Sequence, residues 1–244
     1  MSECRATMDT SNETEALYGT IVWKNDALVL FDKKACVLTV PGRQGDGDPR
    51  PCLGRWLQDH LKTRLFPVHR LDYEVSGAVV FALSPQAHRT ASLAFESRAV
   101  RKRYQAITAL PGVVPNDGAV FVWESRLVRG KRRSFEAPHG QLARTHARFV
   151  GRIGNDKAGV FGTDASLGLW ELTPETGKPH QLRVHLTNAG FPIAGDLLYG
   201  GPRAAAEQQG IALRAVSLMF QDEATRTALG TPTTFDLPLL VART

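Results

Sequence analysis

One carboxylate stands at a place in the sequence where it could do chemistry. Asp72 ends the HRLD segment at residues 69–72, which follows Pro67 and shortly precedes a glycine and an apolar run. Loops at strand edges often hold reactive side chains on a rigid scaffold. An ionised carboxylate there could attack carbon or accept a proton, and it could equally pair with Arg70 or cap a turn. A protein-kinase catalytic loop is excluded, because there the aspartate follows the arginine directly.

A second group of polar side chains opens a helix further along the chain. Residues 176–186, TGKPHQLRVHL, form a polar turn that runs into leucines at helical spacing, with Arg183 near the start of the helix. His180 and His185 are five residues apart and fall on different faces, so a two-histidine metal site fits poorly. On the residues alone, this stretch could also be a surface helix with solvated arginine and histidine.

A third segment joins cations to an aromatic ring. Lys102 and Arg103 lead into Tyr104 at the start of a predicted strand. An aromatic ring beside basic groups suits stacking on an unpaired base. Taken alone the signal is weak, because a tyrosine commonly begins a strand.

The composition favours a nucleic-acid partner. Lys and Arg number 30 against 24 Asp and Glu, which gives a net charge of +6, and 22 of the cations are arginine. Guanidinium groups bind phosphate in bidentate fashion and stack on bases. A GC-rich genome would also enrich arginine, so the composition alone does not decide for RNA or DNA.

The sequence also indicates the cellular compartment in which the protein is expected. Cys4, Cys36 and Cys52 show no CxxC spacing, which argues against a disulfide framework or a cysteine zinc site and favours a reducing cytoplasm. The cleanest apolar run, residues 78–83, is far shorter than the about 20 residues of a membrane helix. Residues 1–17 are polar, lack the apolar core of a signal peptide, and are predicted to be a disordered tail.

The elements that would position these residues alternate irregularly. We expect strands at 21–23, 28–31, 78–83, 104–110 and 169–172, closing strands from residue 211 onward, and helices at 53–61, from Ser84 onward and at 179–189. This order lacks a regular βαβ pattern, so it predicts an α+β fold with a mixed, largely antiparallel sheet and short flanking helices. A single domain over residues 18–244 is expected.

The centre of the chain carries a basic stretch. Residues 126–148 hold seven cations and one acid, Glu136, and are predicted to form a hairpin. Charge runs are usually solvated, but the sign and length of this one favour contact with nucleic-acid phosphates. Within it, Lys131, Arg132 and Arg133 are the predicted phosphate contacts.

The three segments together resemble one family. HRLDYEVSG (69–77), KRYQAI (102–107) and TGKPHQLRVHLTNAGFPIAGDLLYGG (176–201) are similar to the motifs of RluA-type RNA pseudouridine synthases. The resemblance runs from about Ile21 to Leu239, and the HRLD and HQLRVHL motifs, about 110 residues apart, make it highly specific. It implies the pseudouridine synthase fold, a mixed, mostly antiparallel sheet with a central catalytic cleft, and an enzyme that uses no metal or organic cofactor.

The resemblance also implies roles for particular residues. Such enzymes isomerise uridine in RNA; Asp72 would be the catalytic carboxylate, Arg183 its partner, and Tyr104 the ring that packs on uracil. Arg70 would hold RNA around the vacated base position. Other expected substrate or RNA contacts are His69, Lys102, His180 and Gln181.

Several positions depart from the family pattern. Val75 stands where many relatives have threonine, residues 33–36 differ from the usual K-P-x-G, and Pro179 replaces a threonine before the HQ pair. These departures bear on substrate identity more than on activity. An N-terminal S4-type RNA-binding module, which many relatives carry, is expected to be absent.

We therefore predict a single-domain, cytoplasmic, bacterial RNA pseudouridine synthase that acts as a monomer on a stem-loop of rRNA or tRNA. The alternative is a catalytically silent RNA-binding protein on the same fold, which would not need Asp72, Tyr104 and Arg183 together. A metal-dependent nuclease is disfavoured, because the sequence has no acidic cluster near these motifs.

Overall fold

The structure is a computed structural model that describes residues 17–42, 45–110, 112–154, 166–203 and 210–240. Residues 1–16 of the predicted disordered tail lie outside these residues. Across the described ranges, no helix is long and apolar enough to cross a membrane.

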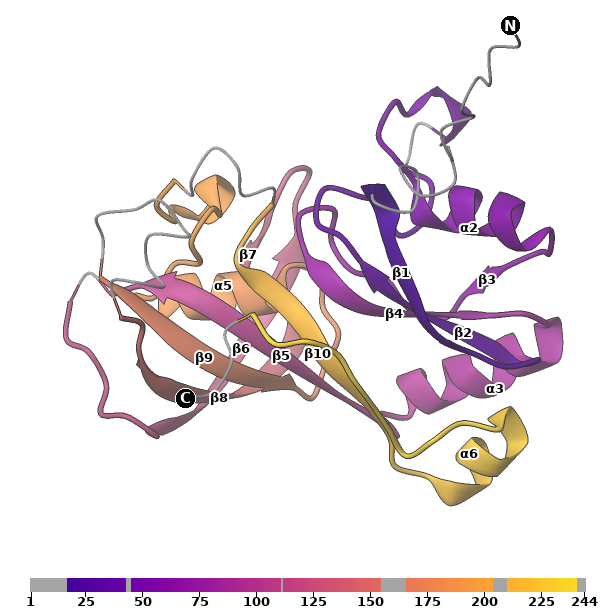
Figure 1. The fold of residues 1–244 in the computed structure, drawn as a ribbon. Coiled ribbons are helices and arrows are strands. Elements are labelled where there is room, and N and C mark those ends of the chain that lie inside the picture. The colour runs from indigo at the N-terminus through magenta and orange to yellow at the C-terminus, as the bar shows by residue number, and fades with distance from the viewer. Residues whose placement is uncertain (1–16, 43–44, 111, 155–165, 204–209, 241–244) are drawn as a thin grey trace, which may run out of the picture.

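The described strands form one sheet in the order β1-β2-β4-β10-β5-β9-β8-β6-β7, with β3 on β4 and β11 on β10 (Figure 1). The parallel pair is β4 with β10, and the other recorded pairs are antiparallel. The predicted α+β fold with a largely antiparallel sheet is confirmed. The strands are β1 (Gly19–Lys24), β2 (Leu28–Lys33), β3 (Phe66–Pro67), β4 (Ser76–Ala82), β5 (Val100–Ala109), β6 (Val120–Arg129), β7 (Ser134–Glu136), β8 (Gln141–Arg152), β9 (Leu167–Pro174), β10 (Leu213–Phe220) and β11 (Thr234–Asp236).

Short helices flank the sheet. In Figure 1, α2 and α3 lie beside the half of the sheet that contains β1, β2 and β4. Helix α3 also packs on α6, whereas α5 packs against β6, β7 and β8. The helices are α2 (Leu53–Leu61), α3 (Pro85–Glu96), α5 (Gln181–Asn188) and α6 (Glu223–Leu229), with 3₁₀ turns η1 (Gly45–Gly47) and η3 (Leu197–Tyr199).

Local capping explains where two of these helices begin. The Ser84 hydroxyl accepts a hydrogen bond from the Ala87 amide, and Pro85 occupies the first helical position of α3, as the sequence predicts. Asp222 caps α6 in the same way through the Thr225 amide. Helix α6 lies where only strands were expected, so that part of the prediction is wrong.

Helix α5 is shorter than predicted at both ends. It begins at Gln181 and ends at Asn188, rather than covering 179–189. The residue before it, His180, adopts a left-handed conformation with φ 54°, which a non-glycine residue seldom takes. The polar turn therefore meets the helix at an angle that brings His180 toward the cleft described below.

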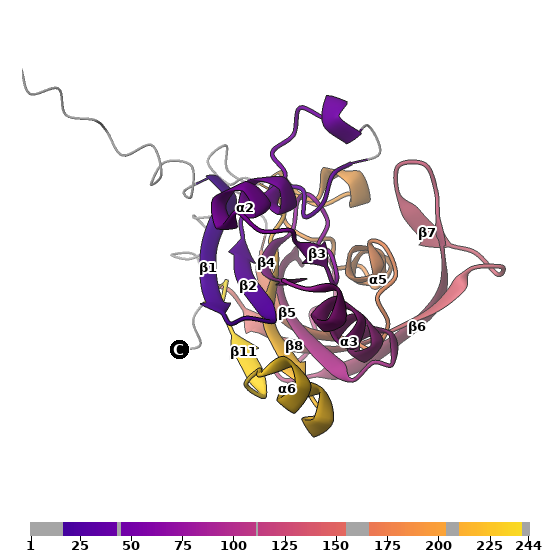
Figure 2. The ribbon, with the colours of Figure 1, turned by 90° about the vertical axis from the view of Figure 1, so that its right-hand side faces the viewer.

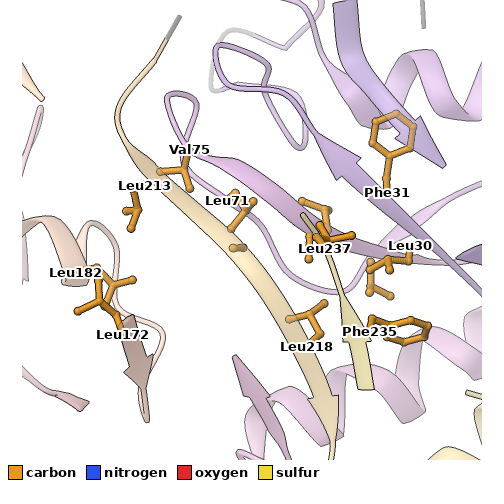
Figure 3. Packing of buried hydrophobic residues seen from close by; sticks show 14 of the residues in the cluster. Leu30, Phe31, Leu71, Val75, Leu172, Leu182, Leu213, Leu218, Phe235 and Leu237 are labelled. Carbon is orange, nitrogen blue, oxygen red and sulfur yellow. The ribbon is translucent and has the colours of Figure 1, made fainter. Parts of the chain in front are cut away.

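The hydrophobic core holds the HRLD loop from both sides of its carboxylate. Leu71 and Val75, which flank Asp72, are buried, and Figure 3 shows Val75 next to Leu213 of β10. The Thr39 hydroxyl accepts a hydrogen bond from the Leu71 amide and donates one to the Leu71 carbonyl, both at 3.1 Å. Burial and hydrogen bonding together fix the backbone that carries Asp72.

Candidate active site

A cleft of about 1260 Å³ opens between the HRLD loop, β5, the β6–β7 hairpin and the start of α5. Asp72, Tyr104 and Arg183 all line it, although they lie far apart in the sequence. The sheet order explains this meeting, because β10 pairs with β4, which follows the HRLD loop, and with β5, which carries Tyr104. The structure thus brings the three residues of the predicted catalytic group into one cleft.

Among the described residues, Asp72 has cationic and polar neighbours but no short ion pair. Its Oδ2 lies 3.8 Å from Nη1 of Arg183 and 4.0 Å from Nε2 of His180, and 24% of its side chain is exposed. Burial raises the pKa of Asp72, and guanidinium groups, that of Arg183 first, oppose this effect. The carboxylate is therefore held beside positive charge with its oxygens still open to the cleft.

Arg183 is fixed by a partner that the sequence analysis did not identify. Its side chain is 2% exposed, and its Nε and Nη2 donate to the two oxygens of Asp196, each at 2.7 Å. Its Nη1 reaches Glu74 Oε2 at 3.3 Å as well as Asp72. The expected pairing of Arg183 with Asp72 is thus the longer of its contacts, and the buried ion pair with Asp196 is the tight one.

Tyr104 and Lys102 lie two residues apart on β5 and both line the cleft. Alternation along a strand puts residues two apart on the same face. Burial raises the pKa of Tyr104 and lowers that of Lys102. Tyr104 therefore keeps its proton and offers the cleft a neutral aromatic ring.

His69, the first residue of the HRLD loop, also lines the cleft. Its ring stacks on Phe95 with 4.6 Å between ring centroids, and its Nε2 accepts a hydrogen bond from the Val80 amide at 3.2 Å. Burial, with a smaller effect of Lys102, lowers the pKa of His69 to about 3, so the ring is neutral. Arg70, the next residue, is exposed and lines the cleft.

Gln181 is engaged inside the protein. It is 4% exposed, and its Oε1 accepts from the Thr176 hydroxyl and the Lys178 amide. Its Nε2 donates to the Arg144 carbonyl and the Thr145 hydroxyl, each at 2.9 Å. Both groups of the amide are used within the protein, where they link the turn before α5 to β8. Gln181 also lines the cleft, and the RNA contact expected of it stays a prediction.

His180 lies at the junction of the cleft and the β6–β7 hairpin. Its Nε2 is 3.1 Å from Nη1 of Arg129, and its Nδ1 is 2.9 Å from the Tyr199 hydroxyl. Burial lowers the pKa of His180 to about 4, and the Arg183 guanidinium acts in the same direction. The ring is therefore neutral near pH 7, with Nε2 facing the cation of the hairpin.

Two cations of the basic stretch have acidic neighbours. Arg144 lies near Glu124 and Glu175, and Arg148 lies near Glu171, so these two cations of β8 face acids outside the 126–148 stretch. The cations of the β6–β7 turn are exposed as well, and Lys131 and Arg132 line the cleft, whereas Arg133 does not. Figure 2 shows this hairpin projecting beside α5.

Comparison with known proteins shows which family the chain belongs to. The family model described as RNA pseudouridylate synthase matches residues 27–188. The chain belongs to this family. It is 32% identical over 210 residues to the dual-specificity RNA pseudouridine synthase RluA of Haemophilus influenzae, covering 82% of this chain and 86% of that one. It is 30% identical over 244 residues to RluA of Escherichia coli, covering 95% and 98%.

The fold agrees as well. The structure of human RNA pseudouridylate synthase domain containing 1 superposes with a TM-score of 0.64 at 20% identity, covering 84% of this chain and 79% of that one. The RluA-type resemblance of the motifs is confirmed, and the chain is an RNA pseudouridine synthase, an isomerase.

The sequence analysis missed two residues of the site, Asp196 and Tyr199. Both lie in the segment GDLLYGG, which contributed to the resemblance to the pseudouridylate synthase family but was given no role. Among the described residues, no three His, Cys, Asp or Glu side chains gather into a group that could hold a metal ion.

Proposed function

We propose that this pseudouridine synthase isomerises a uridine in a stem-loop of rRNA or tRNA, with Asp72 as the catalytic carboxylate. The observation that supports the role of Asp72 is its place in the cleft, beside the buried guanidinium of Arg183 at 3.8 Å. The carboxylate has a neighbouring positive charge, and within the part of the chain that the structure describes no short ion pair competes with substrate for its oxygens.

The reaction explains why a positioned carboxylate is needed. The C1′–N1 bond of the uridine breaks, the uracil turns over, and C5 joins C1′, while C5 loses a proton and N1 carries one in the product. No atom enters from a cofactor, so neither a redox group nor a nucleoside triphosphate is required. The Asp72 carboxylate either attacks C1′ or removes the 2′ proton, and both routes require it to be ionised.

Arg183 keeps the carboxylate in that ionised form. Burial raises the pKa of Asp72, and the Arg183 guanidinium opposes the effect. Asp196 fixes the guanidinium through two hydrogen bonds, so the charge is in place before substrate binds.

Tyr104 receives the target base. The uridine must leave its stack or pair at a cost of a few kcal/mol. A neutral aromatic ring in the cleft can return about 1–3 kcal/mol by stacking on uracil. Arg70, Lys102 and His180 line the same cleft and are the proposed contacts to the surrounding RNA.

The cations of the β6–β7 turn extend this surface. Lys131, Arg132 and Arg133 are exposed, and we assign them to RNA phosphates rather than to the uracil. In this way the hairpin supplies RNA affinity, while Asp72, Tyr104 and Arg183 act on the uridine.

A mapping experiment tests the proposal. Total RNA from a strain that lacks the gene is incubated with the purified protein, and pseudouridine is located by carbodiimide modification. The proposal expects new pseudouridine at one or a few loop positions with wild-type protein and none with Asp72→Asn. Binding of RNA without any new pseudouridine would instead support the catalytically silent alternative.

A further inference from the structure

The Tyr199 hydroxyl joins the β6–β7 hairpin to the catalytic cleft. Tyr199 ends the η3 turn and is 8% exposed. Its hydroxyl accepts from the Ser134 amide at 2.8 Å, donates to the Ser134 carbonyl at 3.0 Å, and lies 2.9 Å from Nδ1 of His180. One phenol thus contacts both the first residue of β7 and the residue before α5.

The direction of each hydrogen bond follows from the groups involved. A guanidinium only donates, so the Nη1 of Arg129 requires Nε2 of His180 to be the acceptor. The proton of the neutral ring is then on Nδ1, which donates to the Tyr199 hydroxyl. The hydroxyl proton is directed to the Ser134 carbonyl, so the network is satisfied by one tautomer of His180.

Arg129 contacts neutral groups in this arrangement. It is exposed at the cleft, and its recorded partners are the neutral His180 ring and, at 3.4 Å, the Arg132 carbonyl. Within the described part of the chain it forms no ion pair with an acid, unlike Arg144, Arg148 and Arg183. A guanidinium held by neutral acceptors and facing an open cleft is suited to bind phosphate through its remaining N–H groups.

We propose that Arg129 binds a phosphate of the RNA next to the target nucleotide. Tyr199, acting through His180, positions the Arg129 guanidinium for this contact. The inference rests on RNA being the substrate, and it assigns Arg129 and Tyr199 roles that the motifs do not specify. Without the Tyr199 hydroxyl, His180 is free to carry its proton on Nε2. The Nε2–H would then repel the N–H of Arg129, whereas the unprotonated Nε2 accepts a hydrogen bond from it.

The strain at His180 agrees with a positioning role. Its φ of 54° places the ring where Nδ1 reaches Tyr199 and Nε2 reaches Arg129. Strained backbone of this kind persists only where surrounding contacts hold it, and it clusters at functional sites. Asn also tolerates this conformation, so His180→Asn removes the ring without imposing a new backbone cost.

The test measures RNA binding as a function of salt, independently of turnover. The probe is a short RNA stem-loop with uridine in its loop, and the variants are Tyr199→Phe, Arg129→Gln and the double variant. Each lost phosphate contact flattens the log–log salt dependence by about 0.7–0.9. We expect this loss for each single variant and no further loss in the double variant, because both changes remove the same contact.

A second readout separates positioning from general destabilisation. The ¹⁵N NMR signals of His180 report which ring nitrogen carries the proton, and we expect Nδ1 in the wild type and a shift toward Nε2 in Tyr199→Phe. Tyr18→Phe, which removes a hydroxyl from a ring stacked on Trp56 outside the cleft, is the matched control and should change neither readout.

Three results would overturn the inference: a wild-type salt dependence in Arg129→Gln, additive losses in the double variant, or an unchanged His180 tautomer in Tyr199→Phe. If Tyr199→Phe fails to fold, His180→Asn takes its place in the binding experiment with the same expected loss. Failure of the proposed function is distinguishable, because it appears as absent pseudouridine while these binding results are unaffected.

Discussion

Arg183 donates to both oxygens of Asp196 at 2.7 Å, whereas its distance to the nearer oxygen of Asp72 is 3.8 Å. The buried aspartate therefore holds the guanidinium, and the guanidinium in turn provides positive charge to the carboxylate proposed to act on substrate. This arrangement separates the task of fixing Arg183 from the task of keeping Asp72 ionised.

Removing the guanidinium should affect both tasks. In Arg183→Met, Asp196 becomes a buried and unpaired charge, which should lower the free energy of unfolding by about 3–5 kcal/mol. The double variant Arg183→Met/Asp196→Asn should regain much of this stability but little activity. Urea unfolding and pseudouridine formation measure the two effects. Recovery of near-normal activity in the double variant would contradict the role assigned to Arg183.

The same substitution should change the pH dependence of the residual activity. Burial raises the pKa of Asp72 and Arg183 opposes it, so loss of Arg183 leaves the raised pKa uncompensated. Because the ionised form is the active one, the acidic limb of the pH–rate profile should move to higher pH. Single-turnover rates across the acidic range test this, and an unmoved limb would mean that Arg183 does not control the ionisation of Asp72.

Lys33 should make the free energy of unfolding depend on pH in the alkaline range. It is fully buried, its ammonium donates to the carbonyls of Lys34 and Val37, and burial lowers its pKa from 10.5 to about 7. Between these values the unfolded chain binds more protons than the folded one, so this residue makes stability rise with pH. The slope is at most about 1.4 kcal/mol per pH unit.

Comparison with Lys33→Met isolates this contribution. We expect the difference in unfolding free energy between wild type and Lys33→Met to change in favour of the wild type as pH rises through that window. Urea titrations at several pH values provide the measurement. A constant difference would show that Lys33 does not change its protonation state on folding.

Neutralising the hairpin turn should weaken RNA binding in a salt-dependent manner. The variant with Lys131, Arg132 and Arg133 all changed to Gln should flatten the log–log salt dependence by about 2 if each cation meets a phosphate. Turnover at saturating RNA should change little. The control is Arg144→Gln/Arg148→Gln, whose cations already face Glu124, Glu175 and Glu171. Equal slopes in the triple variant and wild type would return this turn to an ordinary solvated surface.

The sequence predicted the elements whose signals are local. Helix α3 begins at Ser84-Pro85 as expected, and the apolar run at 78–83 corresponds to β4. Helix α6 was missed although Asp222 and Gly230 mark its ends, because the tail was interpreted from its weak alternation. Capping residues were thus more informative there than periodicity.

The sequence likewise identified the residues of the site but not the contacts between them. The motifs identified the residues that line the cleft, including Asp72, Tyr104 and Arg183. They could not reveal that Asp196 is the tight partner of Arg183 or that the Gln181 amide is used internally, because both facts depend on contacts between distant segments. Counting charges within 126–148 likewise overlooked the acids that approach Arg144 and Arg148 from outside that stretch.

The most direct test of the central claim is the activity of Asp72→Asn. This change keeps the shape of the side chain and removes its charge and basicity, so we expect no pseudouridine above background while RNA affinity stays near that of the wild type. Asp59→Asn, an exposed acid on α2 outside the cleft, is the control and should remain fully active. Pseudouridine formation by Asp72→Asn at more than a few per cent of the wild-type rate would contradict the assignment of Asp72 as the catalytic carboxylate.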